Sequence, residues 1–381
     1  MAPAEEEKDD PGLDIVIAIQ FVAGIALLIA GAEWLVRGAS RLAAALGMTP
    51  LVIGITVVAF GTSAPEFTVG ALSARSGHGD IALGNVLGSN IFNVLVILGL
   101  SALIVPHRVA RQLVYWDVPV MIGVSGFLYL LAANGKLGRL EALLLLAGCL
   151  LYTAWSIRQG RREESPLLKY IPVRSKGVGK KSYQETAAFH GLLVIGGLAL
   201  LVLGARWLVS SSESIARAAG LSELIIGLTI VAAGTSLPEV AASIVAAVRG
   251  ERDIAVGNIV GSNILNILGV LGLSAAVSPA GIPVTPAALA FDIPVMFAVA
   301  LVCLPIVFTR HRVARWEGAL LLLYYAAYIL YLILDAKGHD ALPQFSETML
   351  CFVLPVTAVA LSAVAANQLR RILGLVRRGG L

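Results

Sequence analysis

The stretch Gly61-Thr-Ser-Ala-Pro-Glu66 lies inside a long apolar segment and recurs as Gly234-Thr-Ser-Leu-Pro-Glu239, 173 residues further along the chain. A second stretch, Gly84-Asn-Val-Leu-Gly-Ser-Asn-Ile-Phe-Asn93, recurs at the same spacing as Gly257-Asn-Ile-Val-Gly-Ser-Asn-Ile-Leu-Asn266. Two long motifs repeated at one spacing indicate that the chain contains the same structural unit twice.

The composition is that of a membrane protein. Hydrophobic residues make up 58% of the 381 residues and charged residues only 14%, whereas a soluble chain carries about a quarter. The mean hydropathy is +0.86. The apolar blocks are long enough to cross a bilayer as helices, which takes about 20 residues, and too long for the ~10-residue strands of a membrane barrel. We therefore predict a polytopic, all-α membrane protein.

Each half of the chain is predicted to contain five membrane spans. They lie near residues 13–43, 50–75, 80–105, 112–132 and 140–157, and near 187–217, 223–248, 253–278, 287–308 and 315–335. An odd number of spans per half makes the halves enter the membrane from opposite sides, so we expect two inverted five-helix repeats with ten spans in all. A further apolar segment, Met349 to Ala366, predicts an eleventh, C-terminal span.

This division gives five regions. They are an acidic extracytoplasmic tail (1–12), a first repeat (13–157), a basic linker (158–186), a second repeat (187–335), and the extra span with a basic tail (348–381). Placing the linker in the cytoplasm places most of the 28 Lys and Arg residues on that side, as the positive-inside rule requires. We therefore expect a multi-pass protein of the cell (inner) membrane, with the N-terminus outside and the linker in the cytoplasm.

The first motif combines a buried acid with a break in its helix. A carboxylate such as Glu66 is costly inside an apolar segment unless it is paired or hydrated. Pro65 has no N–H for the Gly61 carbonyl, so the helix opens in front of Glu66. Thr62 and Ser63 precede Glu66 by four and three residues and can share its helix face. The corresponding residues of the second copy are Thr235, Ser236, Pro238 and Glu239.

The second motif is predicted to complete a cation site. Ser89 and Asn93 are four residues apart, as are Ser262 and Asn266, so each pair projects from one helix face. An inverted repeat brings its two copies together near the middle of the membrane. Two carboxylates and nearby carbonyls supply about six oxygens, the lower end of what Ca²⁺ takes, whereas Mg²⁺ prefers a smaller octahedral cage and keeps its water. Two close carboxylates repel, so one Ca²⁺, several Na⁺ or protons would neutralise them in alternation, as an antiporter requires.

Both motifs resemble those of the sodium/calcium exchanger family of the cation/calcium exchanger superfamily, prokaryotic type. The resemblance covers roughly residues 12–335. It implies a secondary-active antiporter that exchanges Ca²⁺ for Na⁺ by alternating access, with the first and sixth spans sliding against the rest. The cation-binding residues that it implies are Glu66 and Glu239 for Ca²⁺, with the carbonyls of Thr62 and Thr235; Ser63, Ser236, Ser89, Ser262, Ala59 and Ala232 for Na⁺; and Asn93 and Asn266 beside the central pocket. Potassium-dependent relatives tend to carry aspartate at the last two positions, which argues against potassium dependence.

Other functions stay open on the sequence alone. A Ca²⁺/H⁺ antiporter could use the same scaffold, with protons in place of Na⁺. An intramembrane enzyme and a purely structural membrane protein are remote alternatives, because no histidine lies in the middle of a predicted span, no HExxH-like pattern occurs, and a structural protein needs no pair of buried carboxylates. We therefore expect no enzymatic activity, no cofactor and no nucleic-acid partner. The expected partners are Ca²⁺, Na⁺ and membrane lipid, and the sequence leaves the oligomeric state open.

The remaining polar residues of the spans have structural interpretations. Asn85, Asn90, Asn258 and Asn263 are predicted to make hydrogen bonds between helices, and the same role is the alternative for Asn93 and Asn266. Asp80, Asp253, Asp117 and Asp292 are predicted to cap helix N-termini.

Overall fold

The computed structural model describes residues 11–167, 180–218, 232–308, 311–339 and 341–355, together with Thr357 and Val359. Helices dominate these residues, which confirms an all-helical membrane fold. Eight described helices are long and apolar enough to cross a bilayer, or nine if the bent pair Pro50–Thr62 and Ala64–Arg75 counts as one span. The expected spans at 223–248 and 349–366 lie partly outside the described residues, so the count of ten or eleven stays a prediction.

The first half contains the five expected apolar segments, several of them divided into α-helical and π-helical (η) parts. Its elements are α1 (Pro11–Leu46), α2 (Pro50–Ile53), η1 (Gly54–Val58), α3 (Ala59–Thr62), α4 (Ala64–Arg75), α5 (Gly79–Phe92), η2 (Asn93–Leu98), α6 (Gly99–Ile104), β1 (His107–Arg108), η3 (Leu113–Asp117), α7 (Val118–Ala132), β2 (Lys136–Leu137) and α8 (Arg139–Leu167).

The second half repeats this order where it is described. Its elements are α9 (Lys180–Ala218), α11 (Ala232–Gly234), α12 (Leu237–Val248), α13 (Arg252–Leu265), η5 (Asn266–Leu271), α14 (Gly272–Val277), β3 (Ile282–Pro283), η6 (Ala288–Asp292), α15 (Ile293–Phe308), β4 (Arg312–Val313), α16 (Arg315–Ala336), α17 (Leu342–Thr348) and η8 (Met349–Val353). Helices α8 and α9 both extend into the predicted linker, of which residues 168–179 lie outside the described residues.

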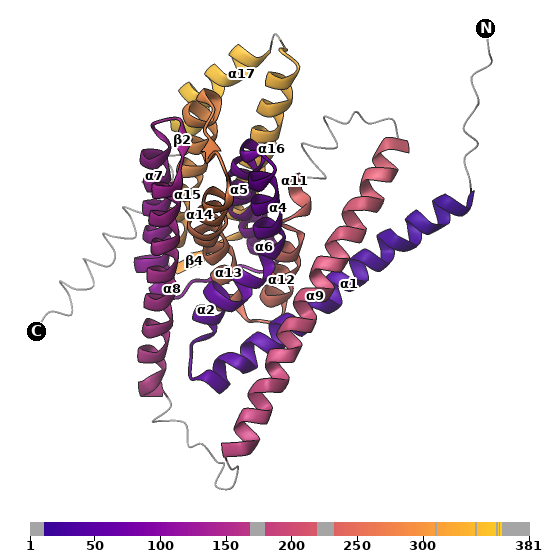
Figure 1. Ribbon diagram of the computed structural model, residues 1–381, viewed down its shortest axis with the longest axis vertical. Helices are drawn as coiled ribbons and strands as arrows, with labels where there is room; N and C mark the ends of the chain where they lie inside the picture. Colours follow the sequence, from indigo (N-terminus) through magenta and orange to yellow (C-terminus); the bar gives the residue numbers. More distant parts are fainter. Residues whose placement is uncertain are drawn as a thin grey trace, which may run out of the picture.

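Helices α1 and α9 pack side by side along one flank of the bundle (Figure 1). Glycines allow the two backbones to approach closely. A Cβ atom on Gly31 would lie 2.7 Å from the carbonyl oxygen of Gly197, and one on Gly197 would lie 2.6 Å from the backbone nitrogen of Leu35. In a bilayer, where apolar burial drives helix association weakly, such close packing is what holds helices together.

The two segments that carry the second motif form the centre of the molecule. The segment α13–η5–α14 is buried within the bundle and α5–η2–α6 is mostly buried, whereas α16 has few fully buried residues. Leu323 of α16 is 68% exposed and Leu150 of α8 is 72% exposed, as expected of side chains that face lipid. The polar motifs therefore lie in the middle of the bundle, away from lipid.

Two short strand pairs join the halves, and neither was predicted. Strand β1 pairs antiparallel with β4, and β2 pairs antiparallel with β3. Because β1 and β3 occupy corresponding places in the two repeats, as do β2 and β4, each pair links one half to the other. Strands of two residues are too short to leave a periodic pattern in the sequence.

The helix caps predicted at four aspartates are wrong. Helix α5 has His78 at its N-cap and α13 has Glu251, so Asp80 and Asp253 lie in the first turn instead. Asp117 ends the π-helical turn η3 with helical dihedral angles, and its carboxylate accepts a hydrogen bond from Tyr152 (2.9 Å). The aspartates at the start of α7 and α15 follow a preceding helical turn, which removes the free N–H groups that a cap would bind.

The α1–α9 contact yields a stability prediction. We expect Gly31→Val to lower the thermal unfolding temperature of the detergent-purified protein, because the added side chain must push the two backbones apart, at a cost of about 1–3 kcal/mol. Gly123→Val is the control, since a Cβ atom at this position of α7 meets no atom within 4 Å. Equal unfolding temperatures for the two variants would contradict the prediction.

Candidate cation site

Both copies of the first motif break their helix at a serine. Helix α3 ends just before Ser63 and α4 begins just after it, with an angle of 47° between the two parts of the span. Pro65 has no N–H to continue the helical hydrogen bonds across this turn. Ser236 has the same backbone conformation, with ψ of 4° against 8° at Ser63. The helix breaks predicted at both motifs are therefore confirmed.

Each break places a glutamate in the first turn of the helix that follows. Glu66 lies in the first turn of α4 and Glu239 in the first turn of α12, where the helix dipole favours negative charge. Their side chains are 0% and 1% exposed. The two carboxylates lie close enough to interact electrostatically. The structure thus brings together the two acidic groups, one from each half.

Serines of the opposite half hold each carboxylate. The Ser63 hydroxyl donates to Glu239 Oε1 (2.9 Å) and the Ser236 hydroxyl donates to Glu66 Oε1 (3.3 Å). The Ser89 hydroxyl lies 3.4 Å from the same oxygen of Glu66 and 3.2 Å from Ser236 Oγ. The two copies of the first motif therefore meet face to face, and Ser89 from the second motif joins them.

The threonines of the first motif are fixed by asparagines of the opposite half. The Thr62 hydroxyl donates to Asn258 Oδ1 (3.1 Å) and the Thr235 hydroxyl to Asn85 Oδ1 (3.3 Å). Asn258 in turn donates to Ser243 Oγ (3.0 Å). The hydrogen bonds between helices predicted for Asn85 and Asn258 are confirmed. Ser243 was missed, because its counterpart in the first half is a glycine and the repeat therefore gave no signal.

Four asparagines of the second motif hydrogen-bond across the two halves. Asn93 donates to Asn263 Oδ1 (3.1 Å), and Asn266 donates to Asn90 Oδ1 (3.1 Å). Asn93 and Asn266 also begin the π-helical segments η2 and η5, a distortion that often marks functional positions in helices. Asn90 therefore binds the amide group of Asn266, and Asn263 binds that of Asn93. The hydrogen bonds between helices predicted for Asn90 and Asn263 are confirmed.

Two methionines complete this network and were not predicted. Asn90 Nδ2 lies 3.5 Å from the sulfur of Met296, and Asn263 Nδ2 lies 3.4 Å from the sulfur of Met121. Both methionines belong to a repeated stretch, Asp-x-Pro-Val-Met, at positions 117–121 and 292–296. That repetition could have identified them, but an apolar residue in an apolar span carries no chemical signal of its own.

Five buried oxygens at this centre have no hydrogen-bond donor among the described residues. They are Glu66 Oε2, Glu239 Oε2, Asn93 Oδ1, Asn266 Oδ1 and Ser262 Oγ. Buried acceptors without a donor are destabilising and uncommon in proteins. All five are oxygens of the kind that bind Ca²⁺ and Na⁺, and they come from four segments that the fold brings together. The arrangement is suited to hold cations.

The two alanines of the predicted set occupy equivalent backbone positions. Ala59 begins α3, and its carbonyl oxygen accepts from the N–H of Ser63 (3.0 Å) and lies 3.4 Å from the Thr62 hydroxyl. Ala232 begins α11. Both therefore lie one turn before a helix break.

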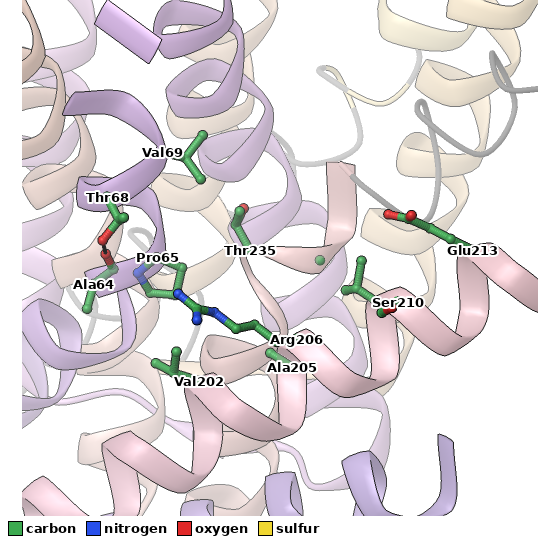
Figure 2. A pocket seen from close by; sticks show the side chains of 12 residues that line it. Ala64, Pro65, Thr68, Val69, Val202, Ala205, Arg206, Ser210, Glu213 and Thr235 are labelled. Atoms are coloured by element: carbon green, nitrogen blue, oxygen red, sulfur yellow. Dashed lines mark hydrogen bonds between the residues drawn. The ribbon is translucent and has the colours of Figure 1, made fainter. Parts of the chain in front are cut away.

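A cavity of about 360 Å³ lies next to the site, on the side of α9 (Figure 2). It lies between α4, α9 and the turn at Thr235, the residue next to Ser236. Most of its lining is apolar, and Arg206 of α9 extends into it. The sequence did not predict this cavity, because the packing of α9 against α4 has no signature in either helix.

Comparison with known proteins agrees with this geometry. The family model described as "Sodium/calcium exchanger protein" matches residues 16–158 and 189–334. The putative antiporter CaxA of Alkalimonas amylolytica is 39% identical over 272 residues, which are 70% of this chain and 83% of that protein. The sodium/calcium exchanger MaX1 of Methanosarcina acetivorans is 32% identical over 300 residues, 71% of this chain and 85% of the relative.

A solved structure shares the fold. The sodium-calcium exchanger NCX_Mj superposes with a TM-score of 0.71 at 30% sequence identity, covering 84% of this chain and 99% of the other. The residues matched by the family model include both copies of each motif. This chain belongs to the sodium/calcium exchanger family.

Proposed function

We propose that this protein exchanges Ca²⁺ for Na⁺ across the membrane at the site formed by Glu66 and Glu239. The observation that carries the proposal is the pair of buried carboxylates from opposite halves, each bound by a serine of the other half, with a second oxygen that lacks a donor. Membership of a family of ion exchangers supports transport over catalysis.

The exchange follows from the charge of the site. Two adjacent carboxylates in a water-poor interior repel each other and need positive charge to offset them. One Ca²⁺ or several Na⁺ ions can supply it, and once one of these loads has neutralised the two carboxylates the site has no further negative charge to hold the other. Binding of one ion therefore displaces the other, and the site returns across the membrane only when it is loaded.

The remaining residues have roles that their positions support. In this proposal Thr62 and Thr235 add backbone carbonyls to the Ca²⁺ ligands, and Asn93 and Asn266 lie beside the central pocket. The Na⁺ positions are lined by Ser63, Ser236, Ser89, Ser262, Ala59 and Ala232. The protein lies in the cell (inner) membrane as two inverted repeats, with the N-terminal tail outside and the basic linker in the cytoplasm.

Flux measurements in proteoliposomes test the proposed coupling. We expect an outward Na⁺ gradient to drive uptake of radioactive Ca²⁺, and a pH gradient of equal size at constant Na⁺ to drive none. Uptake driven by the pH gradient alone would replace the proposal by Ca²⁺/H⁺ exchange on the same scaffold.

Loss of either carboxylate should abolish exchange. Glu66→Gln or Glu239→Gln leaves a single charge against Ca²⁺ in a buried site, so we expect the initial rate of Na⁺-driven Ca²⁺ uptake to fall by about 100-fold or more. The measurement is uptake in proteoliposomes that contain equal amounts of protein.

Glu141→Gln provides the matched control for this change. The Glu141 carboxylate accepts from the N–H of Gly138 (2.9 Å) in the first turn of α8, away from the site, and an amide oxygen can do the same. The control should retain exchange, and all three variants should elute as the wild type in size-exclusion chromatography. Retained exchange in Glu66→Gln would reject this site.

The serine hydroxyls should set the affinity for Na⁺. A hydrogen bond to a charged group contributes about 1.5–3 kcal/mol, so Ser63→Ala should raise the half-saturating Na⁺ concentration of exchange by about tenfold. Ser63→Thr keeps the hydroxyl and should retain most of the affinity. Ser156→Ala, at a buried serine of α8 outside the site, should leave the Na⁺ dependence unchanged. An unaltered Na⁺ dependence in Ser63→Ala would remove this serine from the site.

A further inference from the structure

A cluster of charges fastens α1 to the end of α12. Arg249, the residue after α12, binds both carboxylate oxygens of Glu33 in α1, one of them through Nε at 2.6 Å. Glu33 also pairs with Arg37 one turn further along α1 (2.5 Å). Ser40, in the same helix, donates to Glu251 (2.8 Å). Two contacts thus join α1 to the connection between α12 and α13.

The repeat shows what stands at the equivalent interface of the other half, between α9 and α4. With the spacing of 173 residues, the counterparts of Glu33, Arg249, Ser40 and Glu251 are Arg206, Ser76, Glu213 and His78. Arg206 has no ion-pair partner among the described residues, and Glu213 pairs with Arg217 of its own helix (3.5 Å). The cation site is preserved in both halves, whereas the ion pair exists in one half only.

The two interfaces also differ in packing. Val36 of α1 and Ala242 of α12 are each 1% exposed and belong to one buried cluster. Their counterparts Val209 and Val69 instead line the cavity of about 360 Å³ between α9 and α4, where Figure 2 shows Val69. The α1–α12 interface is therefore closed in the same structure in which the α9–α4 interface is open.

We propose that the Glu33–Arg249 ion pair is a latch that holds α1 against α12, and so favours the conformation that is open between α9 and α4. Alternating access requires α1 to leave α12 when α9 closes on α4, and that step separates Arg249 from Glu33. The latch rests on the proposed exchange, in which α1 and α9 move against the rest. It acts outside the cation site, since neither side chain contacts Glu66 or Glu239.

Cysteine accessibility at two equivalent positions tests the latch. Val36→Cys and Val209→Cys are made one at a time in full-length protein whose native cysteines, Cys149, Cys303 and Cys351, are replaced. The rate of modification by a small water-soluble thiol reagent is measured in nanodiscs, where both membrane faces are exposed. With the latch intact, we expect Val209→Cys to react at least about tenfold faster than Val36→Cys.

Breaking the latch should move the two rates in opposite directions. Glu33→Gln or Arg249→Gln should speed Val36→Cys and slow Val209→Cys, each by about threefold or more, and the double variant should match either single one. A loosened structure would instead speed both positions together. Arg249→Gln removes the ion pair without altering α1, so it serves if Glu33→Gln does not fold.

Arg37→Gln is the matched control, because this arginine pairs with Glu33 within one helix and does not bridge to α12. It should leave both rates unchanged. Unchanged rates in Glu33→Gln and Arg249→Gln, or rates that rise together, would overturn the latch. These rates do not depend on which ions are carried, so a protein that exchanges Ca²⁺ for Na⁺ but shows no shift rejects the latch alone, and a shift without Na⁺-driven flux rejects the proposed exchange alone.

Discussion

The repulsion between two buried carboxylates is the constraint on which the rest of this structure depends. Glu66 and Glu239 are fully enclosed, and each has one oxygen bound by a serine of the opposite half. In a soluble enzyme, water can hydrate two such carboxylates and weaken their repulsion. A pocket in the middle of a membrane bundle has little water for this purpose. The two carboxylates must therefore be neutralised by mobile cations that bind at the site. The selectivity of the site then depends on which cations fit its ligands.

The inverted repeat is the economical way to build that site. The two helix breaks face each other, and side-chain hydrogen bonds from the opposite half hold each of them. Thr62 binds Asn258 and Thr235 binds Asn85, so each break is held by the helix of the other half. Neither half could form its part of the site alone, which explains why both motifs occur twice in full.

The sequence predicted this centre well because its chemistry is unusual for a membrane. Acids, prolines and asparagines in apolar spans are costly, so their repetition identifies the site and the span order together. The packing residues gave no such signal. Met121, Ser243 and the cavity beside Arg206 follow from how helices meet, and the strand pairs from how loops meet. The caps predicted at Asp117 and Asp292 failed because a π-helical turn precedes α7 and α15, and those at Asp80 and Asp253 failed because α5 and α13 begin earlier than expected.

The departure from symmetry follows from the same reasoning. A site that faces both sides of the membrane in turn needs equal ligands from both halves, so selection on binding preserves the repeat there. The contacts that close the α1–α12 and α9–α4 interfaces are under a different constraint. If both interfaces closed through identical contacts, the exchanger would favour neither conformation. The charges that join α1 to α12 lie at positions where the halves differ, and the equivalent interface beside α9 carries Arg206 in place of Glu33. The symmetric residues can therefore govern what is carried, while the asymmetric ones set which conformation the protein prefers at rest.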